Sequence, residues 1–486
     1  MNIEILKNLK NLKSPVLFLG FIGVSSISWA QVAPPPFAPS NGPPAVISQP
    51  LTPYYSGSVS AGQATSTPID LTLRDAIQRG LRYNLGVLTN KDIVDVVRAE
   101  RQRTLSTLLP NFSVGFTQNE AQNDLIAFGL SLPGIPKVVG PFHYQNARAY
   151  FQQTIYDKPS LKNLKSANES KNAAILTAED ARNLVVQAVS NAYLAVITDA
   201  ARIQAIQAEM DTAQALYKRA QDQKSAGTVP AIDVLRAQLQ YQTEQQRLVA
   251  ETNQREKDKL TLARTIGLPN GQPLNVTDLL PFLPLNAALD DLLKQAYDRR
   301  PDFRAAQADV RAAQYAIDSA RSEHWPSIVL QADYGDVGST LFTNAHGTFT
   351  ILGGVRVPIY AGGRTRTDID QAEAVFRNKK NAVEDLRGRI DFEVRSALLD
   401  LTSAADQVAV ARTNVDLANE TVTEARDRFS AGVTDNIEVI QAQQLLASAN
   451  ENYISSLNAH NEAKIALATA LGAAEESVPQ YLNLKP

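Results

Sequence analysis

The chain has 486 residues, in which 50 Asp and Glu offset 47 Lys and Arg, so the formal net charge is only −3. This near balance gives no electrostatic footprint for a nucleic-acid partner. The absence of cysteine excludes disulfides, thiolate catalysis, Cys-based metal sites and a cysteine-linked lipid anchor. The four histidines lack the spacing of metal ligands, and we expect neither a metal nor another cofactor.

The N-terminal segment has the pattern of a secretory signal peptide. Three lysines precede an apolar run over residues 16–27, and Ser28-Trp29-Ala30 offers a small-x-small cleavage site. The apolar run is shorter than the roughly 20 residues that span a bilayer. We therefore predict a signal peptide over residues 1–30 and an exported protein. The proline-rich stretch over residues 31–67 cannot pack as helix or sheet interior, which predicts a periplasmic linker.

One helix of moderate length is predicted next in each half of the chain, over residues 71–109 in the first half and 287–324 in the second. Thr72 is the expected N-cap of the first, with Asp75 three residues later. Pro110 and Pro326 end these helices and turn the chain into extended structure.

Two pairs of strands follow these helices. Their apolar and polar side chains alternate with period two, clearly over residues 112–117, 328–334 and 349–357 and less clearly over 147–155. Loops rich in Gly, Pro and Asn are expected over residues 118–144 and 336–347. In the second pair, the side chains expected to face lipid are Ile328, Leu330, Tyr334, Phe349, Ile351, Val355 and Val357.

A long helix and a returning helix close each half. The long helices are expected over residues 159–226 and 365–431, each about 100 Å at 1.5 Å per residue. The returning helices are expected over residues 230–266 and 435–471. Both are rich in Ala and Gln with narrow apolar stripes, which favours coiled-coil-like pairing over a globular core.

These elements form one unit that is present twice. Ala226-Gly227 and Ala431-Gly432 each open a matching segment, 205 residues apart, and other matches occur in the same order at offsets of 216 and 204. The predicted divisions are the signal peptide (1–30), the linker (31–67), the first repeat (68–272), a connector (273–286), the second repeat (287–472) and a C-terminal tail (473–486).

Four strands per chain cannot form a membrane barrel alone. Membrane barrels start at about eight strands, and an open sheet edge is not tolerated in lipid. Three copies that share one barrel would supply 12 strands. The predicted fold class is therefore a mixed α and β membrane protein, in which duplicated antiparallel helical hairpins form a periplasmic α-barrel and a homotrimer shares a 12-stranded transmembrane β-barrel.

The order helix, strand pair, long helix, Ala-Gly turn and returning helix, given twice, resembles the TolC-like outer-membrane efflux proteins. The motifs that carry the resemblance run from Ser225 to Leu235 and from Phe429 to Ile440. The resemblance implies a trimeric channel-tunnel in the outer membrane of a Gram-negative-type bacterium. It also implies that the channel receives substrates from an inner-membrane pump through a periplasmic adaptor and exports them.

The resemblance further assigns roles to residues at the hairpin turns. The tip that meets the adaptor is carried onto Gly227, Thr228, Gly432 and Val433. Glu438 takes the position of a carboxylate that faces the lumen at the periplasmic entrance, and Asp233 is its counterpart in the first repeat. In a trimer each would form a ring that favours cations. Each also fits an acidic residue that simply stabilises the first turn of a helix.

Three positions depart from the family's gate pattern. Phe429 and Thr434 stand where a tyrosine and an arginine can form a closing network, and Gln441 stands where a second ring carboxylate can lie. An ionic lock of that form is therefore not expected here.

Other functions remain open at this point. No nucleophile elbow, phosphate loop or catalytic carboxylate pair is present, so an enzyme is not expected. A type I protein secretion channel is one alternative, and a soluble periplasmic coiled-coil scaffold is an alternative from a different class.

Overall fold

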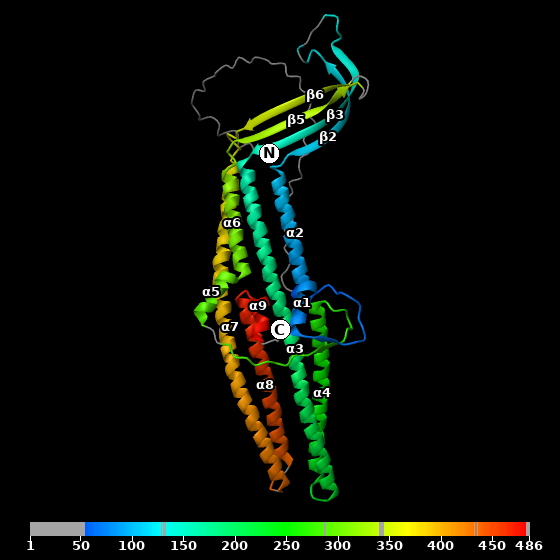
Figure 1. The fold of residues 1–486 in the computed structure, drawn as a ribbon, viewed down its shortest axis with the longest axis vertical. Coiled ribbons are helices and arrows are strands. Elements are labelled where there is room, and N and C mark those ends of the chain that lie inside the picture. The colour runs from blue at the N-terminus through cyan, green and yellow to red at the C-terminus, as the bar shows by residue number, and fades with distance from the viewer. Residues whose placement is uncertain are drawn as a thin grey trace, which may run out of the picture. The chain divides into compact units, whose positions relative to one another are not determined.

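Two helical hairpins and a four-stranded sheet make up most of the structure. The computed structural model describes residues 54–127, 129, 133–285, 288–339, 345–431, 433–434 and 436–482, all within one unit over residues 51–486. The sheet lies at one end of the helices, and the turns that close the hairpins lie at the other end (Figure 1). The predicted signal peptide and residues 31–53 of the predicted linker lie outside the described residues.

The first half of the chain follows the predicted order. Its elements are a 3₁₀ turn (Tyr54–Ser56), β1 (Ile69–Leu71), α1 (Leu73–Tyr83), α2 (Leu85–Ser106), β2 (Asn111–Asp124), β3 (Val138–Tyr156), α3 (Lys158–Ser225) and α4 (Ala231–Ile266). The predicted N-cap is confirmed: the Asp75 N–H donates to Thr72 Oγ1 at 3.2 Å, and the Thr72 hydroxyl donates to the Asp75 carboxylate at 2.7 Å.

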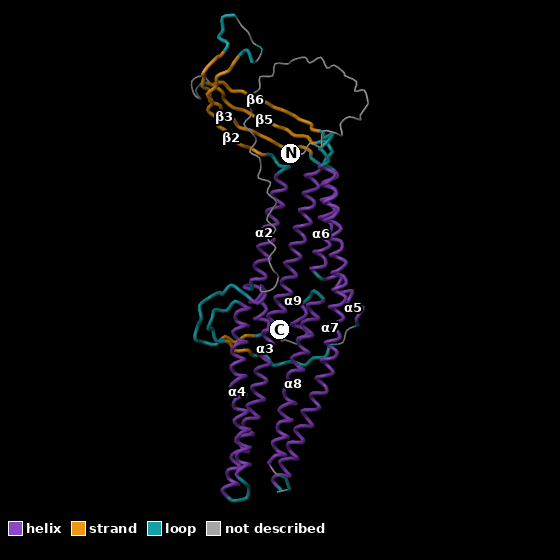
Figure 2. The backbone as a smooth tube through the Cα atoms, turned by 180° about the vertical axis from the view of Figure 1, so that it is seen from behind, coloured by secondary structure: helices purple, strands orange, loops and turns teal. Residues whose placement is uncertain are grey.

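The second half repeats this order. Its elements are β4 (Leu274–Val276), α5 (Leu289–Arg299), α6 (Pro301–Arg321), β5 (Ser327–Gly338), β6 (Ala345–Arg356), α7 (Arg364–Ser430), α8 (Asn436–Ala470) and α9 (Ala474–Tyr481). The predicted long and returning helices are confirmed by α3 and α7 and by α4 and α8. Helix α9 and the short parallel pair of β1 and β4, seen beside the middle of the helices in Figure 2, were not predicted.

Each of the two predicted moderate helices is broken into two, so that part of the prediction is wrong. The first breaks at Asn84 and the second at Arg300, where the backbone has ψ values of 135° and 119°. Pro301 accounts for the second break, because a proline disfavours the α conformation in the residue before it. An offset of 216 residues carries α1 onto α5 and Asn84 onto Arg300, so the break belongs to the duplicated unit.

Asn84 fills the first break with a buried side chain. Its amide group donates to the Tyr55 carbonyl at 2.7 Å and to the Thr265 carbonyl at 3.0 Å, and its Oδ1 accepts from the Gly86 N–H at 2.8 Å. One side chain therefore caps the start of α2 and ties the break to the end of α4.

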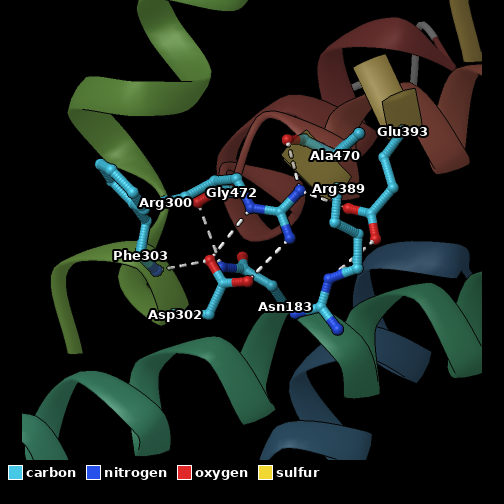
Figure 3. Close-up of polar contacts among 8 residues, drawn as sticks. All are labelled: Asn183, Arg300, Asp302, Phe303, Arg389, Glu393, Ala470 and Gly472. Carbon is cyan, nitrogen blue, oxygen red and sulfur yellow. Dashed lines mark hydrogen bonds and ion pairs between the residues drawn. The ribbon is translucent and has the colours of Figure 1, made fainter. Parts of the chain in front are cut away.

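Arg300 fills the second break (Figure 3). Its guanidinium donates to the Ala470 carbonyl at 3.2 Å, to Glu393 on α7, and to both carboxylate oxygens of Asp302 at 3.0 and 2.8 Å. Asp302 also accepts from the Phe303 N–H at 2.8 Å and so satisfies a backbone donor in the first turn of α6. Burial lowers the pKa of Arg300, but the hydrogen bonds and charges of Asp302 and Glu393 outweigh burial and hold that pKa above its ordinary value.

The two breaks are held at equivalent places by different side chains. An offset of 205 residues carries Thr265 onto Ala470. Asn84 and Arg300 therefore bind equivalent carbonyls, one at the end of each returning helix. We call these two contacts the helix-break clamps. A glycine with positive φ follows each returning helix and packs closely against the break. A Cβ on Gly267 would lie 2.6 Å from Tyr83 Cβ, and a Cβ on Gly472 would lie 2.7 Å from Arg300 Cα.

The helices pack side by side in a fixed order. Near the sheet the order is α2, α3, α6, α7, and towards the hairpin turns it is α4, α3, α8, α7.

Two apolar clusters lie at the level of the breaks, one around Val189 and Leu262 and one around Ile390 and Leu467. Within the described residues one helix, α3, has a window long and apolar enough to cross a bilayer, and more than half of that window is buried.

The sheet has the strand order β2, β3, β5, β6, and every neighbouring pair is antiparallel. The strands are longer than predicted, because residues 118–124, 138–144, 336–338 and 345–347 belong to strands and not to the expected loops. Since β2 and β6 are the outer strands of this sheet, each has one edge that no strand of the described chain pairs with.

Three buried polar side chains on α8 hold the connector and the C-terminal helix. The Lys464 ammonium donates to the Tyr481 carbonyl at 3.1 Å, and the Asn461 amide donates to the Pro281 carbonyl at 2.8 Å. The His460 ring packs against Phe282 at 5.0 Å between centroids. Burial, with the nearby charge of Lys464, lowers the pKa of His460 to about 4.

We predict that Arg300→Met destabilises the fold by about 3 kcal/mol, because it leaves the carboxylates of Asp302 and Glu393 without their buried partner. The measurement is unfolding in detergent followed by circular dichroism. Arg311→Met is the matched control, because Arg311 is exposed, pairs with Glu169 at 2.8 Å and should contribute less than about 1 kcal/mol. Equal losses for both variants would contradict the clamp.

We also predict that His460 makes the fold sensitive to acid. Because its pKa is depressed in the folded state, its contribution to stability is complete above about pH 6.5 and is lost as the pH falls towards 4. His460→Leu should flatten the dependence of the unfolding midpoint on pH in this window. The same change at the exposed His324 is the control, and an unchanged slope in His460→Leu would refute the assignment.

Candidate functional site

One face of the sheet is apolar and exposed. The register places Tyr334 opposite Phe349, Ala332 opposite Ile351, and Ile328 opposite Val355. On β2, alternate positions of the same face carry three further exposed apolar side chains, Phe112, Val114 and Phe116. Of the predicted lipid-facing residues, Leu330 is half-buried and Val357 lies one residue beyond β6, and the other five are exposed residues of β5 and β6.

The opposite face carries a polar cluster that the sequence analysis missed. Arg148 on β3 is buried, pairs with Asp333 on β5, and donates to Thr348 Oγ1 on β6 at 2.6 Å. The neighbour of Arg148 across the β3–β5 pair is Gly335, where a Cβ would lie only 2.6 Å from Arg148 Cα. The missing side chain lets the guanidinium cross β5, so one arginine links three strands. Its signal in the sequence was alternation alone, which does not reveal a partner 185 residues away.

The first hairpin turn is a bare tip. Gly227 has a φ of 72° and nothing within 4 Å of where its Cβ would lie. The Thr228 N–H and hydroxyl both donate to the Gln223 carbonyl, at 3.0 and 2.9 Å, and close the turn. Asp233 is largely buried at the start of α4 and forms an ion pair with Arg236 at 3.4 Å.

The second hairpin turn is built differently. Gly432 lies outside the described residues, and Val433 is exposed. One oxygen of Glu438 lies 3.1 Å from Arg428 Nη1 at the end of α7, and the other accepts from the Thr434 hydroxyl. The structure therefore brings Thr434 and Glu438 together.

The other two gate-position residues lie apart from this contact. The guanidinium of Arg219 on α3 lies 5.6 Å above the Phe429 ring, so Phe429 contacts the first hairpin of the same chain. A cavity of about 420 Å³ lies beside them, lined also by Asp211, Leu216 and Arg426. Gln441 is exposed on α8.

A layer of charged residues that sequence patterning did not indicate lies in the first hairpin and contacts α8 of the second hairpin. Arg202 on α3 pairs with Glu451 on α8 at 3.0 Å and lies 3.9 Å from Glu251 on α4. Arg247 pairs with Glu244 at 2.8 Å. Burial raises the pKa of Asp199 in this layer well above its ordinary value, with Asp258 adding to the shift.

The described residues contain no group of three or more His, Asp or Glu that could hold a metal ion. Their chemistry is that of a surface with one apolar sheet face, one polar sheet face and charged helix turns. Such an arrangement can line and enclose a passage.

Comparison with known proteins agrees with this geometry. A toluene efflux pump outer membrane protein (TtgF) of Pseudomonas putida is 24% identical over 414 residues, 84% of this chain and 85% of that protein. Outer membrane protein OprJ of Pseudomonas aeruginosa is 23% identical over 421 residues, covering 82% of this chain and 83% of OprJ.

Solved structures show the same fold. The Campylobacter jejuni CmeC outer membrane channel superposes with a TM-score of 0.73 at 14% identity, over 89% of this chain and 93% of CmeC. The outer membrane protein VceC of Vibrio cholerae gives a TM-score of 0.71 at 16% identity, over 83% of this chain and 97% of VceC.

A family model described as "Outer membrane efflux protein" matches residues 139–268 and 292–473, well over half of the chain. The chain belongs to the outer membrane efflux protein family, and it is an outer-membrane efflux channel protein and not an enzyme.

Proposed function

We propose that three copies of this chain close into one channel, with a shared 12-stranded β-barrel in the outer membrane and a helical tube in the periplasm. The observation that carries this proposal is the sheet itself. Its apolar face carries exposed residues of β2, β5 and β6, and its two outer edges lack a partner within the described chain. Pairing β6 of one copy with β2 of the next removes every open edge, as lipid requires.

The helices support the same closure. Their order ends on one side with α7 and on the other with α2 and α4. Exposed apolar side chains lie along these outer helices, spaced mostly by multiples of a helical turn, which suits packing against another copy. We call them the seam residues: Ile93, Val96, Ile232, Leu235, Leu239, Val249, Leu260, Val375, Phe392, Leu399, Val410 and Leu417.

In this proposal the domains keep their predicted limits. The signal peptide is residues 1–30, and the linker is residues 31–67. The two repeats are residues 68–272 and 287–472, joined by the connector 273–286, and the C-terminal tail is residues 473–486. Relatives named as efflux pump outer membrane proteins support a partnership with an inner-membrane pump and a periplasmic adaptor. The adaptor would meet the bare tips at Gly227, Thr228, Gly432 and Val433.

The carboxylates of Glu438 and Asp233 would lie at the periplasmic entrance. Glu438 is the stronger candidate for a lumen ring, because its side chain is about one-third exposed whereas that of Asp233 is largely buried.

The proposal of a trimeric channel is tested by purifying the protein in detergent, measuring its mass and recording conductance in planar bilayers. A trimer that conducts is expected. A monomer that is soluble without detergent would instead support the scaffold alternative, and copurification of a secreted protein would support the secretion alternative.

The apolar sheet face gives a paired prediction. Ile351→Arg should reduce insertion into membranes, because an arginine facing lipid near the bilayer centre costs about 2–4 kcal/mol. Thr350→Arg, one residue away on the other face, should be tolerated. The measurement is the fraction of protein in the outer-membrane fraction that resists urea extraction, and equal losses for the two variants would show that this face does not meet lipid.

The seam gives a second prediction. Phe392→Glu combined with Leu399→Glu should shift the protein from trimer to monomer in detergent, since both side chains are exposed on α7 and would carry charge into the seam. Leu279→Glu changes a leucine in the connector that is even more exposed, and it is the control. Light scattering after size-exclusion chromatography gives the mass, and a stable trimer of the double variant would rule out this seam.

A further inference from the structure

The second hairpin turn carries a contact that crosses the turn. Arg428 stands in the last turn of α7 and Glu438 in the first turn of α8, and their side chains meet at 3.1 Å. The Thr434 hydroxyl donates to the other oxygen of the same carboxylate. The Arg428 and Glu438 side chains remain 54% and 37% exposed, so the pair stays in contact with water.

The first hairpin turn is an internal comparison, and it lacks this contact. An offset of 205 residues pairs Arg428 with Gln223, Thr434 with Val229, and Glu438 with Asp233. All three members of the cross-turn contact therefore differ between the repeats. Asp233 instead pairs along its own helix with Arg236, whose counterpart in the second repeat is Gln441. The repeats have thus placed the basic partner of the first-turn carboxylate on different helices.

The charge around the two turns also differs. Residues 219–236 contain three basic and two acidic residues, and residues 424–441 contain two basic and four acidic residues. The first turn is therefore net positive by one charge and the second net negative by two. In the second turn, loss of Arg428 would raise the negative charge from two to three per chain.

A structural role for the pair is expected in any case. An arginine at a helix C-terminus and a glutamate at a helix N-terminus each interact favourably with the helix dipole. That role, however, needs only that each charge stand on its own helix. The direct contact across the turn has a further effect, because a cation within 4 Å of a carboxylate cancels much of the field that the carboxylate projects beyond the pair.

We infer that Arg428 sets the ion selectivity of the periplasmic entrance by neutralising Glu438. This inference rests on the proposed trimeric channel, in which three such pairs surround one opening. Paired with Arg428, the Glu438 ring favours cations weakly. Without Arg428, the same ring favours cations strongly, since a ring of unpaired carboxylates attracts cations and repels anions.

The experiment measures the reversal potential of purified trimers in planar bilayers under a KCl gradient centred near 0.1 M. Arg428→Gln should raise the ratio of potassium to chloride permeability about threefold or more, and Arg428→Lys should stay near the wild-type value because it keeps the charge. Glu438→Gln should lower the ratio below wild type. The effect of Arg428→Gln should shrink at 1 M salt, where the Debye length falls to about 3 Å.

Arg236→Gln is the matched control, because it removes an arginine that pairs with the equivalent acid in the first repeat. It should change the ratio by less than half as much as Arg428→Gln. Trimer mass and single-channel conductance are recorded for each variant, and a structural role alone would alter these without changing selectivity.

The outcomes separate the two levels of the argument. A wild-type protein that forms no conducting trimer would overturn the channel, and this inference with it. A conducting wild type with the same permeability ratio in Arg428→Gln would overturn this inference and leave the channel intact. Equal shifts in Arg428→Gln and Arg236→Gln would show that total charge at the tips, and not the cross-turn pair, sets selectivity.

Discussion

The structure depends on one repeated constraint, the attachment of a broken helix to the end of a returning helix. A continuous helix would pair its backbone groups internally at this level and would leave none free for a side chain to bind. The break instead exposes helix ends whose unpaired groups need partners, and Asn84 and Arg300 supply them while binding the equivalent carbonyls of Thr265 and Ala470. Because these contacts join three or more segments, they fix where the helices that lead to the sheet meet the hairpins that lead away from it.

The two halves reach this constraint by different chemistry. In the first, one neutral amide serves as donor and acceptor. In the second, a guanidinium cannot accept a hydrogen bond, so the carboxylate of Asp302 accepts from a first-turn N–H of α6, and Glu393 supplies further negative charge. The hairpin turns show the same freedom, because their equivalent acids have basic partners at different places. Duplication has preserved the backbone positions and allowed each half its own electrostatics.

Sequence patterning predicted the long helices, the strand pairs and their order, because these follow from periodicity, prolines and repeated glycines. It did not predict the breaks at Asn84 and Arg300. Pro301 is a local signal for the second break, but the carbonyls that hold the two break residues lie about 170 to 180 residues away in the sequence. The contact of Arg148 with Asp333 and that of Arg428 with Glu438 were missed for a related reason. A sequence shows that a charge is present, but only the register of a sheet or the closure of a turn decides its partner.

The link that Arg148 makes across β3, β5 and β6 has a consequence for how the barrel is assembled. These strands come from both repeats, so the two halves of one chain are joined to each other in the sheet before a second copy is needed. In the proposed trimer, each chain would then enter assembly as a preformed third of the β-barrel, with two unpaired strand edges. Closure would depend on the local concentration of such thirds, and a shortage of chains would leave open edges exposed to aggregation rather than produce smaller pores.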